Sequence, residues 1–196
     1  MPDAALPRRF IFLRHGRSAW NARGLVAGQE DVPLDDQGRA EAETAAALLA
    51  NVPLSGAWCS PLARCRDTLA PLLRRRPDLP VTVVPELMER HWGVYQNGPV
   101  GSRPPRAETP EDGEPAAAFH ARALAAIASA AAERTGAPPP LIVAHAGIFR
   151  CLMDHLSLPG ADGAVANAAP LLIEPDAPAS RRIRPLHPPV STPAER

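Results

Sequence analysis

The sequence is poor in aromatic residues, which make up 4% of its 196 positions, and its formal net charge is zero. Alanine, leucine and valine therefore supply most of the apolar side chains, a composition that favours helices packed on a sheet over a jelly roll or sandwich. Because acidic and basic residues balance, no overall electrostatic field favours nucleic acid or an anionic membrane as a partner. Any site for an anion must be local.

Cysteine and long hydrophobic runs are also scarce. Cys59, Cys65 and Cys151 form neither a CxxC pair nor an even disulfide framework, and each lies in an apolar or helical context typical of a reduced, buried thiol. We interpret them as structural. The apolar stretch after Arg8 and Arg9 is far shorter than a signal peptide or a membrane helix requires. We therefore expect a cytoplasmic protein.

The chain length suits one domain, because 196 residues can bury roughly 70% of the extended-chain surface and form a core without disulfides. Within this single domain, residues 1–196, glycine, proline, serine and charged residues replace helix formers at about 94–115, which predicts a short cap loop. From about residue 175 the chain becomes a proline-rich C-terminal tail, which we expect to be ordered only in part.

Residues 9–14 form an apolar run without alternation, which is typical of a strand covered on both faces. Further short strands are predicted at residues 54–59, 81–84 and 141–144, with residues 169–174 as a last edge strand. Runs of helix-forming residues separate them, and alternating strands and helices predict an α/β fold. We expect a three-layer α/β/α sandwich whose central sheet is mainly parallel, with an antiparallel edge strand.

The expected helices follow from local start and stop signals. The first covers residues 39–49, and the second is capped by Ser60 with Pro61 at its first position. The third covers residues 116–134 and is ended by Gly136, and the fourth covers residues 148–156. Pro71 should kink or end the second of these helices, because its ring removes a backbone hydrogen bond and clashes with the preceding turn. Residues 18–33 contain too much glycine and proline for a long helix and predict a loop.

Charged side chains follow the first four predicted strands. Arg14 and His15 end the first strand, Arg64 lies in the first turn of the helix after the second, Glu89 follows the third, and His145 ends the fourth. The carboxyl ends of parallel strands share one edge of the sheet, where ligands bind. Two guanidinium groups can clamp an oxyanion there, and each charge-assisted hydrogen bond contributes roughly 1.5 to 3 kcal/mol.

This set of side chains suits a phosphoryl group. Hydrolysis of phosphate monoesters demands accelerations of up to about 10²¹-fold, so stabilisation of charge must dominate catalysis. A neutral imidazole such as His15 can take the phosphoryl group, and a carboxylic acid such as Glu89 can protonate the leaving oxygen.

The remaining histidines have more ordinary interpretations. His91, His120, His155 and His187 do not lie at a junction between a strand and a glycine turn, and we interpret them as packing or capping residues. No HxxxH or Cys/His spacing indicates zinc. We predict no metal site.

Taken together, the motifs resemble those of the histidine phosphatase superfamily, also called phosphoglycerate mutase-like. An ordered set of motifs over residues 9–156 is far more specific than one short pattern. The matching stretches are Leu13-Arg14-His15-Gly16 with Ser18-Ala19-Trp20-Asn21, then Gly28, Asp31, Pro33-Leu34 and Gly38, then Ser60 to Thr68, Glu89-Arg90-His91-Trp92-Gly93, Gly113-Glu114 with Phe119 and Arg122, and Ala144-His145-Ala146-Gly147.

The resemblance implies a role for each matching residue. His15 would be the nucleophile that becomes phosphohistidine, and Glu89 would protonate the leaving group and later act as base toward water. Arg14, Arg64 and His145 would hold the phosphoryl oxygens. Asn21 would add a donor, and Arg90 would belong to the residues that bind the phosphate. The resemblance implies no metal and no cofactor.

The sequence also departs from the family pattern. Arg17 occupies a position that is often glutamate; we interpret it as a solvated side chain at the rim rather than as an extra cation for the substrate. Val94-Tyr95-Gln96-Asn97 replaces the commoner Trp-Glu-Gly ending after Gly93, which changes the local pocket. Arg103 and Arg106 in the cap loop are charged residues of a proline-rich segment, and we leave them out of the predicted site.

The short cap argues for hydrolysis, because a mutase must retain and reorient a bisphosphorylated intermediate under a covering wall, whereas a hydrolase needs water to enter. We therefore predict a phosphatase that acts on phosphate monoesters of small metabolites. The alternatives are a phosphoglycerate mutase, suggested by the Glu89 to Gly93 motif, and a non-catalytic module that binds a phosphorylated ligand. The expected partner is a phosphorylated small molecule, and the sequence leaves open whether the chain forms a homodimer.

Overall fold

The computed structural model describes residues 6–130, 137–158, 165–178 and 182–186. A sheet of six strands in the order β3-β2-β4-β1-β5-β6 forms its centre. Strands β1 to β4 run parallel to one another, whereas β5 pairs antiparallel with β1, and β6 pairs antiparallel with β5. The strands are β1 Phe10–Arg14, β2 Ala57–Cys59, β3 Val81–Val83, β4 Leu141–Ala144, β5 Leu171–Ile173 and β6 Ile183–Pro185.

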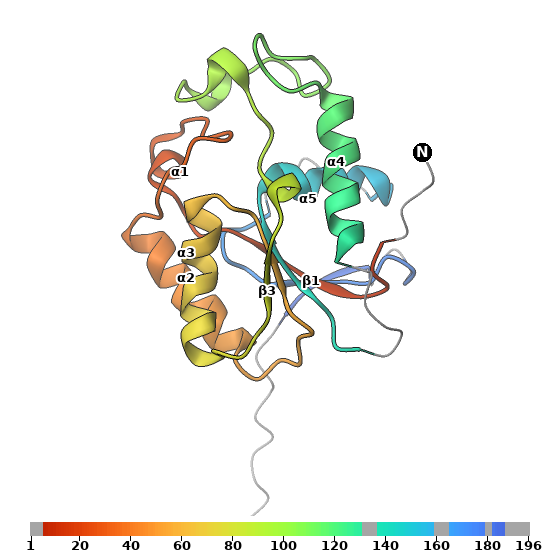
Figure 1. Ribbon diagram of the computed structural model, residues 1–196. Helices are drawn as coiled ribbons and strands as arrows, with labels where there is room; N and C mark the ends of the chain where they lie inside the picture. The colour runs from red at the N-terminus through yellow and green to blue at the C-terminus, as the bar shows by residue number, and fades with distance from the viewer. Residues whose placement is uncertain (1–5, 131–136, 159–164, 179–181, 187–196) are drawn as a thin grey trace, which may run out of the picture.

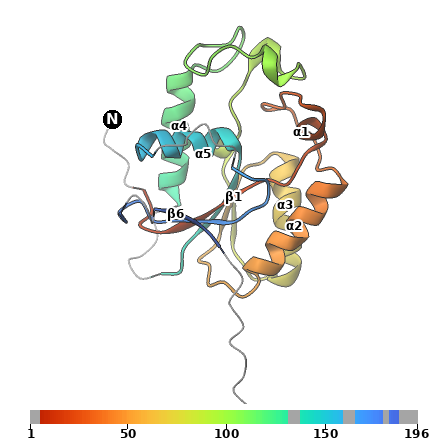
Figure 2. The same cartoon turned by 180° about the vertical axis from the view of Figure 1, so that it is seen from behind.

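Helices cover both faces of this sheet (Figures 1 and 2). Helices α2 (Asp36–Leu49) and α3 (Ala63–Arg75) lie on one face, and α4 (Ala116–Ser129) and α5 (Ala146–His155) lie on the other. The side chains of β1 alternate between two cores, Phe10 and Phe12 toward α4 and α5, Ile11 and Leu13 toward α2 and α3. This arrangement confirms the predicted α/β fold with a mainly parallel sheet.

The ends of several elements differ from the sequence prediction. Residues 19–23 form a short helix, α1 (Ala19–Arg23), where we expected a loop, because Ser18 and Asn21 make a reciprocal capping box. Helix α3 begins at Ala63 rather than after Ser60, and it continues through Pro71 to Arg75. We expected Pro71 to kink or end this helix, and the structure shows that the helix does not end there.

The C-terminal part of the chain adds two strands. The predicted edge strand is confirmed as β5, which pairs antiparallel with β1. Strand β6 then pairs with β5, inside the segment that we expected to be a tail. Residues 131–136, with the predicted stop at Gly136, and His187 lie outside the described residues.

The predicted cap loop contains only short 3-10 turns, η2 (Gly93–Tyr95) and η3 (Val100–Ser102). It passes over the top of the molecule, from above α1 to the start of α4 (Figure 1). Backbone hydrogen bonds tie it to the segment after α1, from Val26 N to Gly98 O at 2.9 Å and from Val100 N to Gly24 O at 2.8 Å. None of the helices in the described part of the chain has the length and apolar character needed to cross a membrane.

Candidate active site

The structure brings most of the predicted site residues together at the carboxyl edge of the sheet. A cavity of about 200 Å³ lies there, lined by Arg14, His15, Asn21, Arg64 and Glu89 among others. We call it the inner cavity. These residues come from the end of β1, from α1, from the first turn of α3 and from the segment after β3. They are far apart in the sequence and meet because the strands run parallel.

His15 is buried, with 5% of its surface exposed, and its protonation is fixed by one neighbour. Its Nδ1 lies 2.8 Å from the carbonyl oxygen of Gly16. Since a carbonyl can only accept, Nδ1 carries the proton, and Nε2 keeps a lone pair. Burial lowers the pKa of His15 well below its usual value, and the charges of Arg64 and Arg14 lower it further. The ring is therefore a neutral imidazole at neutral pH.

The turn after His15 is held by a chain of hydrogen bonds. Gly16 N donates to Thr68 Oγ1 at 2.8 Å, and Thr68 Oγ1 donates to Arg64 O at 2.6 Å. A Cβ on Gly16 would lie 2.5 Å from Gly38 O, so the turn requires glycine. On the other side, Asn167 Nδ2 donates to His15 O at 2.8 Å. Asn167 was missed in the sequence, where nothing distinguishes it from other polar residues near an edge strand.

The two predicted clamp arginines are held by backbone carbonyl groups. Arg14 Nη1 donates to Val165 O at 2.7 Å, and Arg64 donates from Nη1 to Glu30 O at 2.8 Å and from Nη2 to Gly28 O at 2.7 Å. The Nε atoms of both arginines are buried without a hydrogen-bond partner among the described residues. Both arginines line the inner cavity, and two guanidinium groups at one cavity favour an anion as its ligand.

His145 lies next to His15, with 5.2 Å between the ring centroids. It is fully buried, and its Nε2 lies 2.9 Å from Ser60 Oγ. Burial lowers the pKa of His145 well below its usual value, and the nearby Arg64 charge adds to this effect. His145 is therefore neutral and firmly placed beside His15; its contact with a phosphoryl oxygen stays a prediction.

The carboxylate of Glu89 is oriented by two backbone N–H groups. Arg90 N donates to Oε1 at 2.8 Å, and Gly147 N donates to Oε2 at 2.9 Å. A Cβ on Gly147 would lie 1.9 Å from Oε1, so the first turn of α5 can approach the acid this closely only with glycine at this position. The carboxylate is thereby fixed at the edge of the inner cavity.

Arg90 has a different environment from the one that the sequence suggested. Its guanidinium donates from Nε to Glu114 O at 2.9 Å, from Nη1 to Arg106 O at 2.7 Å and from Nη2 to Glu108 O at 2.6 Å. It also stacks on Trp92, with Cζ 4.7 Å from the ring centroid. Three of its five N–H donors thus hold the cap loop, and Arg90 lines the outer cavity described below rather than the inner one. That Arg90 binds the phosphate stays a prediction.

Asn21 and Arg17 differ in their relation to the inner cavity. The Oδ1 atom of Asn21 accepts from Ser18 N at 3.1 Å in the capping box of α1. Its amide nitrogen is the group that it can offer to the cavity that it lines. Arg17 pairs instead with Asp35, Nε to Oδ2 at 2.7 Å, and lines neither the inner cavity nor the larger one described next. This agrees with the interpretation of Arg17 as a rim side chain.

A second, larger cavity of about 520 Å³ adjoins the inner one, and we call it the outer cavity. Its lining includes Trp92, Phe119 and Cys151, and four arginines, at positions 90, 103, 106 and 150. Arg150 lies on α5, five residues after His145, and was missed in the sequence. Because it follows the strand end by little more than one helical turn, the sequence could have indicated that Arg150 lies near the site.

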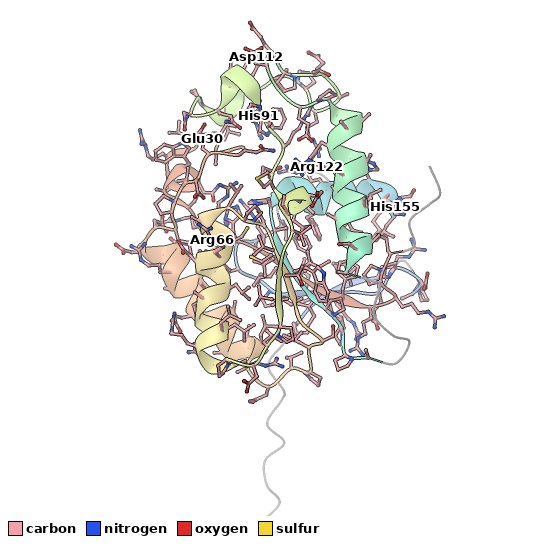
Figure 3. All side chains as sticks on the ribbon, viewed as in Figure 1. Glu30, Arg66, His91, Asp112, Arg122 and His155 are labelled. Atoms are coloured by element: carbon pink, nitrogen blue, oxygen red, sulfur yellow. The ribbon has the colours of Figure 1, made fainter. Side chains whose placement is uncertain are left out.

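The remaining histidines and the cysteines fit their structural interpretations in part. His91 Nδ1 accepts from Gly93 N at 3.2 Å, and His155 lies at the far end of α5 (Figure 3). His120, in contrast, lines the outer cavity. All three cysteines are free and buried, and burial raises the pKa of Cys59 and Cys151 to about 12.

Residues 10–169 match the family profile described as histidine phosphatase superfamily, branch 1. The chain belongs to this superfamily. The motifs around His15, Arg64, Glu89 and His145 thus lie inside the matched region. This confirms the family that the sequence motifs indicated.

Curated members of the superfamily are similar over part of their length. A 2,3-bisphosphoglycerate-dependent phosphoglycerate mutase 2 from Gloeobacter violaceus is 42% identical over 88 residues, which is 44% of this chain and 40% of the mutase. The adenosylcobalamin/alpha-ribazole phosphatase of Salmonella typhimurium is 35% identical over 111 residues, 57% of this chain and 52% of that protein. The aligned regions thus span about half or less of these relatives.

Solved structures of the superfamily match nearly the whole chain. Mycobacterial hydrolase 1 has a TM-score of 0.73 and 27% identity, covering 91% of this chain and 95% of its own. The mycobacterial glucosyl-3-phosphoglycerate phosphatase has a TM-score of 0.72 and 26% identity, covering 91% and 96%. The histidine phosphatase fold therefore extends over the sheet and both helical layers.

Proposed function

We propose that this chain is a phosphatase that hydrolyses phosphate monoesters of small metabolites through a phosphohistidine on His15. The observation that carries the proposal is the environment of the His15 ring. Its Nδ1 donates to Gly16 O, which leaves Nε2 as the nucleophile, and the positively charged Arg14 and Arg64 line the same cavity as His15. Nucleophile and anion site lie in one cavity.

In the first step, His15 Nε2 attacks phosphorus, and the bond between phosphorus and the ester oxygen breaks. Glu89, as a carboxylic acid, gives its proton to that oxygen, and the alcohol leaves. Arg14 and Arg64 stabilise the charge on the three remaining phosphoryl oxygens, with Asn21 as an additional donor and His145 beside the reacting ring. The products are phosphohistidine, the free alcohol and an ionised Glu89.

In the second step, water attacks phosphorus from the side that the alcohol has left. The Glu89 carboxylate takes a proton from the water, and the bond between Nε2 and phosphorus breaks. Inorganic phosphate leaves, His15 returns to its neutral form, and Glu89 is again protonated for the next cycle. These steps use side chains alone, so activity should persist in EDTA.

The cap loop supports hydrolysis over transfer. The segment at about 94–115 contains only two 3-10 turns, and the outer cavity gives water room to approach Glu89. The phosphoglycerate mutase alternative rests on the Glu89 to Gly93 motif and on the mutases among the relatives. Incubation with 3-phosphoglycerate separates the two: free phosphate supports hydrolysis, and 2-phosphoglycerate supports transfer.

A rapid-quench experiment tests the phosphohistidine. Reaction with a ³²P-labelled ester should leave acid-labile phosphate on the wild-type chain and none on His15→Ala. His15→Ala should also lose phosphate release by at least about 10³-fold, as expected for a nucleophile. Turnover of His15→Ala at the wild-type rate would disprove the assignment. Binding without phosphate release across a wide ester panel would instead favour the binding module.

A further inference from the structure

Four residues line both cavities and therefore form the junction between them: Glu89, Trp92, Arg103 and Arg150. If the reacting phosphate occupies the inner cavity, as the proposed function requires, its ester oxygen lies at Glu89. The alcohol part must then pass Arg103 and Arg150 on its way into the outer cavity. Whatever these two side chains recognise is close to the scissile bond.

Arg150 brings an uncompensated charge to this junction. It lies on α5 and is partly buried, and within the described part of the chain its guanidinium makes no hydrogen bond and no ion pair. Asp154 follows one helical turn later and also lines the outer cavity, but it is exposed. Arg150 is thus a cation beside the substrate path that is not paired with a carboxylate in this part of the chain.

Arg103 approaches the same junction from the cap loop. It is partly buried, with Cζ 4.8 Å from the Trp92 ring centroid, and its Nε donates to Val100 O at 3.3 Å. Burial lowers the pKa of Arg103, and the charge of Arg150 lowers it further. The two cations therefore repel each other, and an anion bound between them would remove this repulsion.

The charges that face the outer cavity are predominantly positive. Its lining includes the four arginines named above and two carboxylates, Glu89 and Asp154. Glu89 is already held by the N–H groups of Arg90 and Gly147. The chain contains no lysine, so every fixed cation here is a planar guanidinium that can bind a carboxylate or a phosphate in bidentate fashion.

We propose that Arg103 and Arg150 form a second anion site, so that the preferred substrates are phosphate monoesters whose alcohol carries another negatively charged group near the ester oxygen. This inference rests on the proposed phosphatase function and specifies its substrate class. A carboxylate and a second phosphate share the required chemistry. The test below distinguishes them.

The experiment compares three esters with one two-carbon skeleton: 2-hydroxyethyl phosphate, 2-phosphoglycolate and ethane-1,2-diol bisphosphate. The wild-type chain should have a kcat/KM at least about tenfold higher for an ester with a second anion than for the neutral one, as expected for one charge-assisted contact. The better of the two charged esters identifies the group that the site prefers.

Variants then assign the preference to the two arginines. Arg150→Gln and Arg103→Gln should each reduce the ratio of kcat/KM between charged and neutral esters by about tenfold. Arg150→Lys should retain part of the ratio because it keeps the charge. Arg66→Gln is the matched control, because Arg66 is exposed on α3 (Figure 3) and lines neither cavity, and it should leave the ratio unchanged.

Two results would overturn the second anion site. The first is an equal kcat/KM of the wild-type chain for all three esters. The second is an equal loss of kcat/KM on all three esters in both glutamine variants. Either result leaves the phosphatase function intact. Turnover of the neutral ester shows that each variant is folded. If the wild-type chain releases phosphate from none of the esters and forms no phosphohistidine, the proposed function fails, and the second anion site fails with it.

Discussion

The inner cavity and the cap loop are held together in different ways. At the sheet edge, His15, Arg64 and His145 follow buried strands and are themselves 5% exposed or less. The cap has no regular element longer than a 3-10 turn, and Arg90 holds it through three carbonyl groups. Under the proposed function, the reacting groups therefore lie at rigid strand ends, whereas the surface that faces the alcohol lies on a loop that can change at little cost to the core.

The largest expected effect comes from a substitution beside Glu89, at the edge of the inner cavity. Gly147→Ala would place a Cβ 1.9 Å from Glu89 Oε1, so the carboxylate must move. Because a general acid contributes about 10² to 10⁴-fold, kcat should fall by roughly 100-fold for alkyl phosphates. The loss should be much smaller for p-nitrophenyl phosphate, whose leaving group needs no protonation. Stopped phosphate-release assays measure both rates.

The control for this variant is Gly101→Ala in the cap, where a Cβ would meet nothing within 4 Å. Its rates should match the wild type with both esters. Equal losses on alkyl and nitrophenyl esters in Gly147→Ala would show that Glu89 is not acting as the acid.

A second effect comes from the buried imidazoles at the rigid edge. Burial lowers the pKa of His15 and His145 well below 6.5 in the folded state, whereas the unfolded chain titrates near 6.5. The unfolded state then binds more protons below this pH, so the folded state loses stability as pH falls through about 6.5 and below. Above pH 6.5 the two rings contribute a constant amount to the free energy of unfolding.

Two protons taken up on unfolding correspond to a loss of up to about 2.7 kcal/mol per pH unit. Urea denaturation at pH 7.5, 6.0 and 5.5 measures the slope of the free energy of unfolding. His145→Asn should reduce the slope by about half. A flat profile between pH 6.5 and 5.5 would contradict neutral, buried rings.

A third effect separates the cap from the phosphate site. Arg90→Met removes three bonds to cap carbonyl groups, so the KM for an ester with a large alcohol should rise by about tenfold, as for a lost charge-assisted contact. Inhibition by inorganic phosphate, which needs only the inner cavity, should be unchanged. If Arg90 binds the phosphate, as the sequence suggested, the inhibition constant for phosphate should rise instead.

The smallest effect concerns the rim. Arg17→Gln removes an ion pair with Asp35 whose side chains are 37% and 19% exposed, and such pairs contribute about 0 to 1 kcal/mol. Turnover should stay within about twofold of the wild type, and thermal unfolding should shift by a few degrees at most. A tenfold rise in KM would mean that Arg17 contacts the substrate.

The contrast between the strand ends and the cap loop also explains which site residues could be predicted from the sequence. Five of them lie at or after the ends of predicted strands, and parallel strands end at one edge of a sheet, so we could expect them to lie together. They are Arg14, His15, Arg64, Glu89 and His145. The contacts of Arg90 with the cap loop could not be predicted, because its partners are backbone carbonyl groups of a loop without a repeating pattern. Contacts to carbonyl oxygens leave no trace in residue type.

Element boundaries were harder to predict than element types. Residues 19–23 form a helix because of the capping box between Ser18 and Asn21, a local signal that the glycines around it obscured. Pro71 continues a helix that it was expected to kink or end, and its neighbours Leu69 and Leu72 are buried in the core on the α2 and α3 face. Packing of the helix against the sheet offsets one lost hydrogen bond.

The clamp arginines offer a consequence for how this protein can change during evolution. Arg14 and Arg64 are oriented by the carbonyl oxygens of residues 165, 30 and 28 rather than by acidic side chains. Every amino acid supplies a carbonyl, so positions 30 and 165 can accept new side chains without releasing either guanidinium. Among the described residues neither guanidinium forms an ion pair, so no substitution of an acidic residue there removes a hydrogen-bond partner from either arginine. Under the proposed function, the cap loop can therefore change toward new alcohols while both arginines keep their positions.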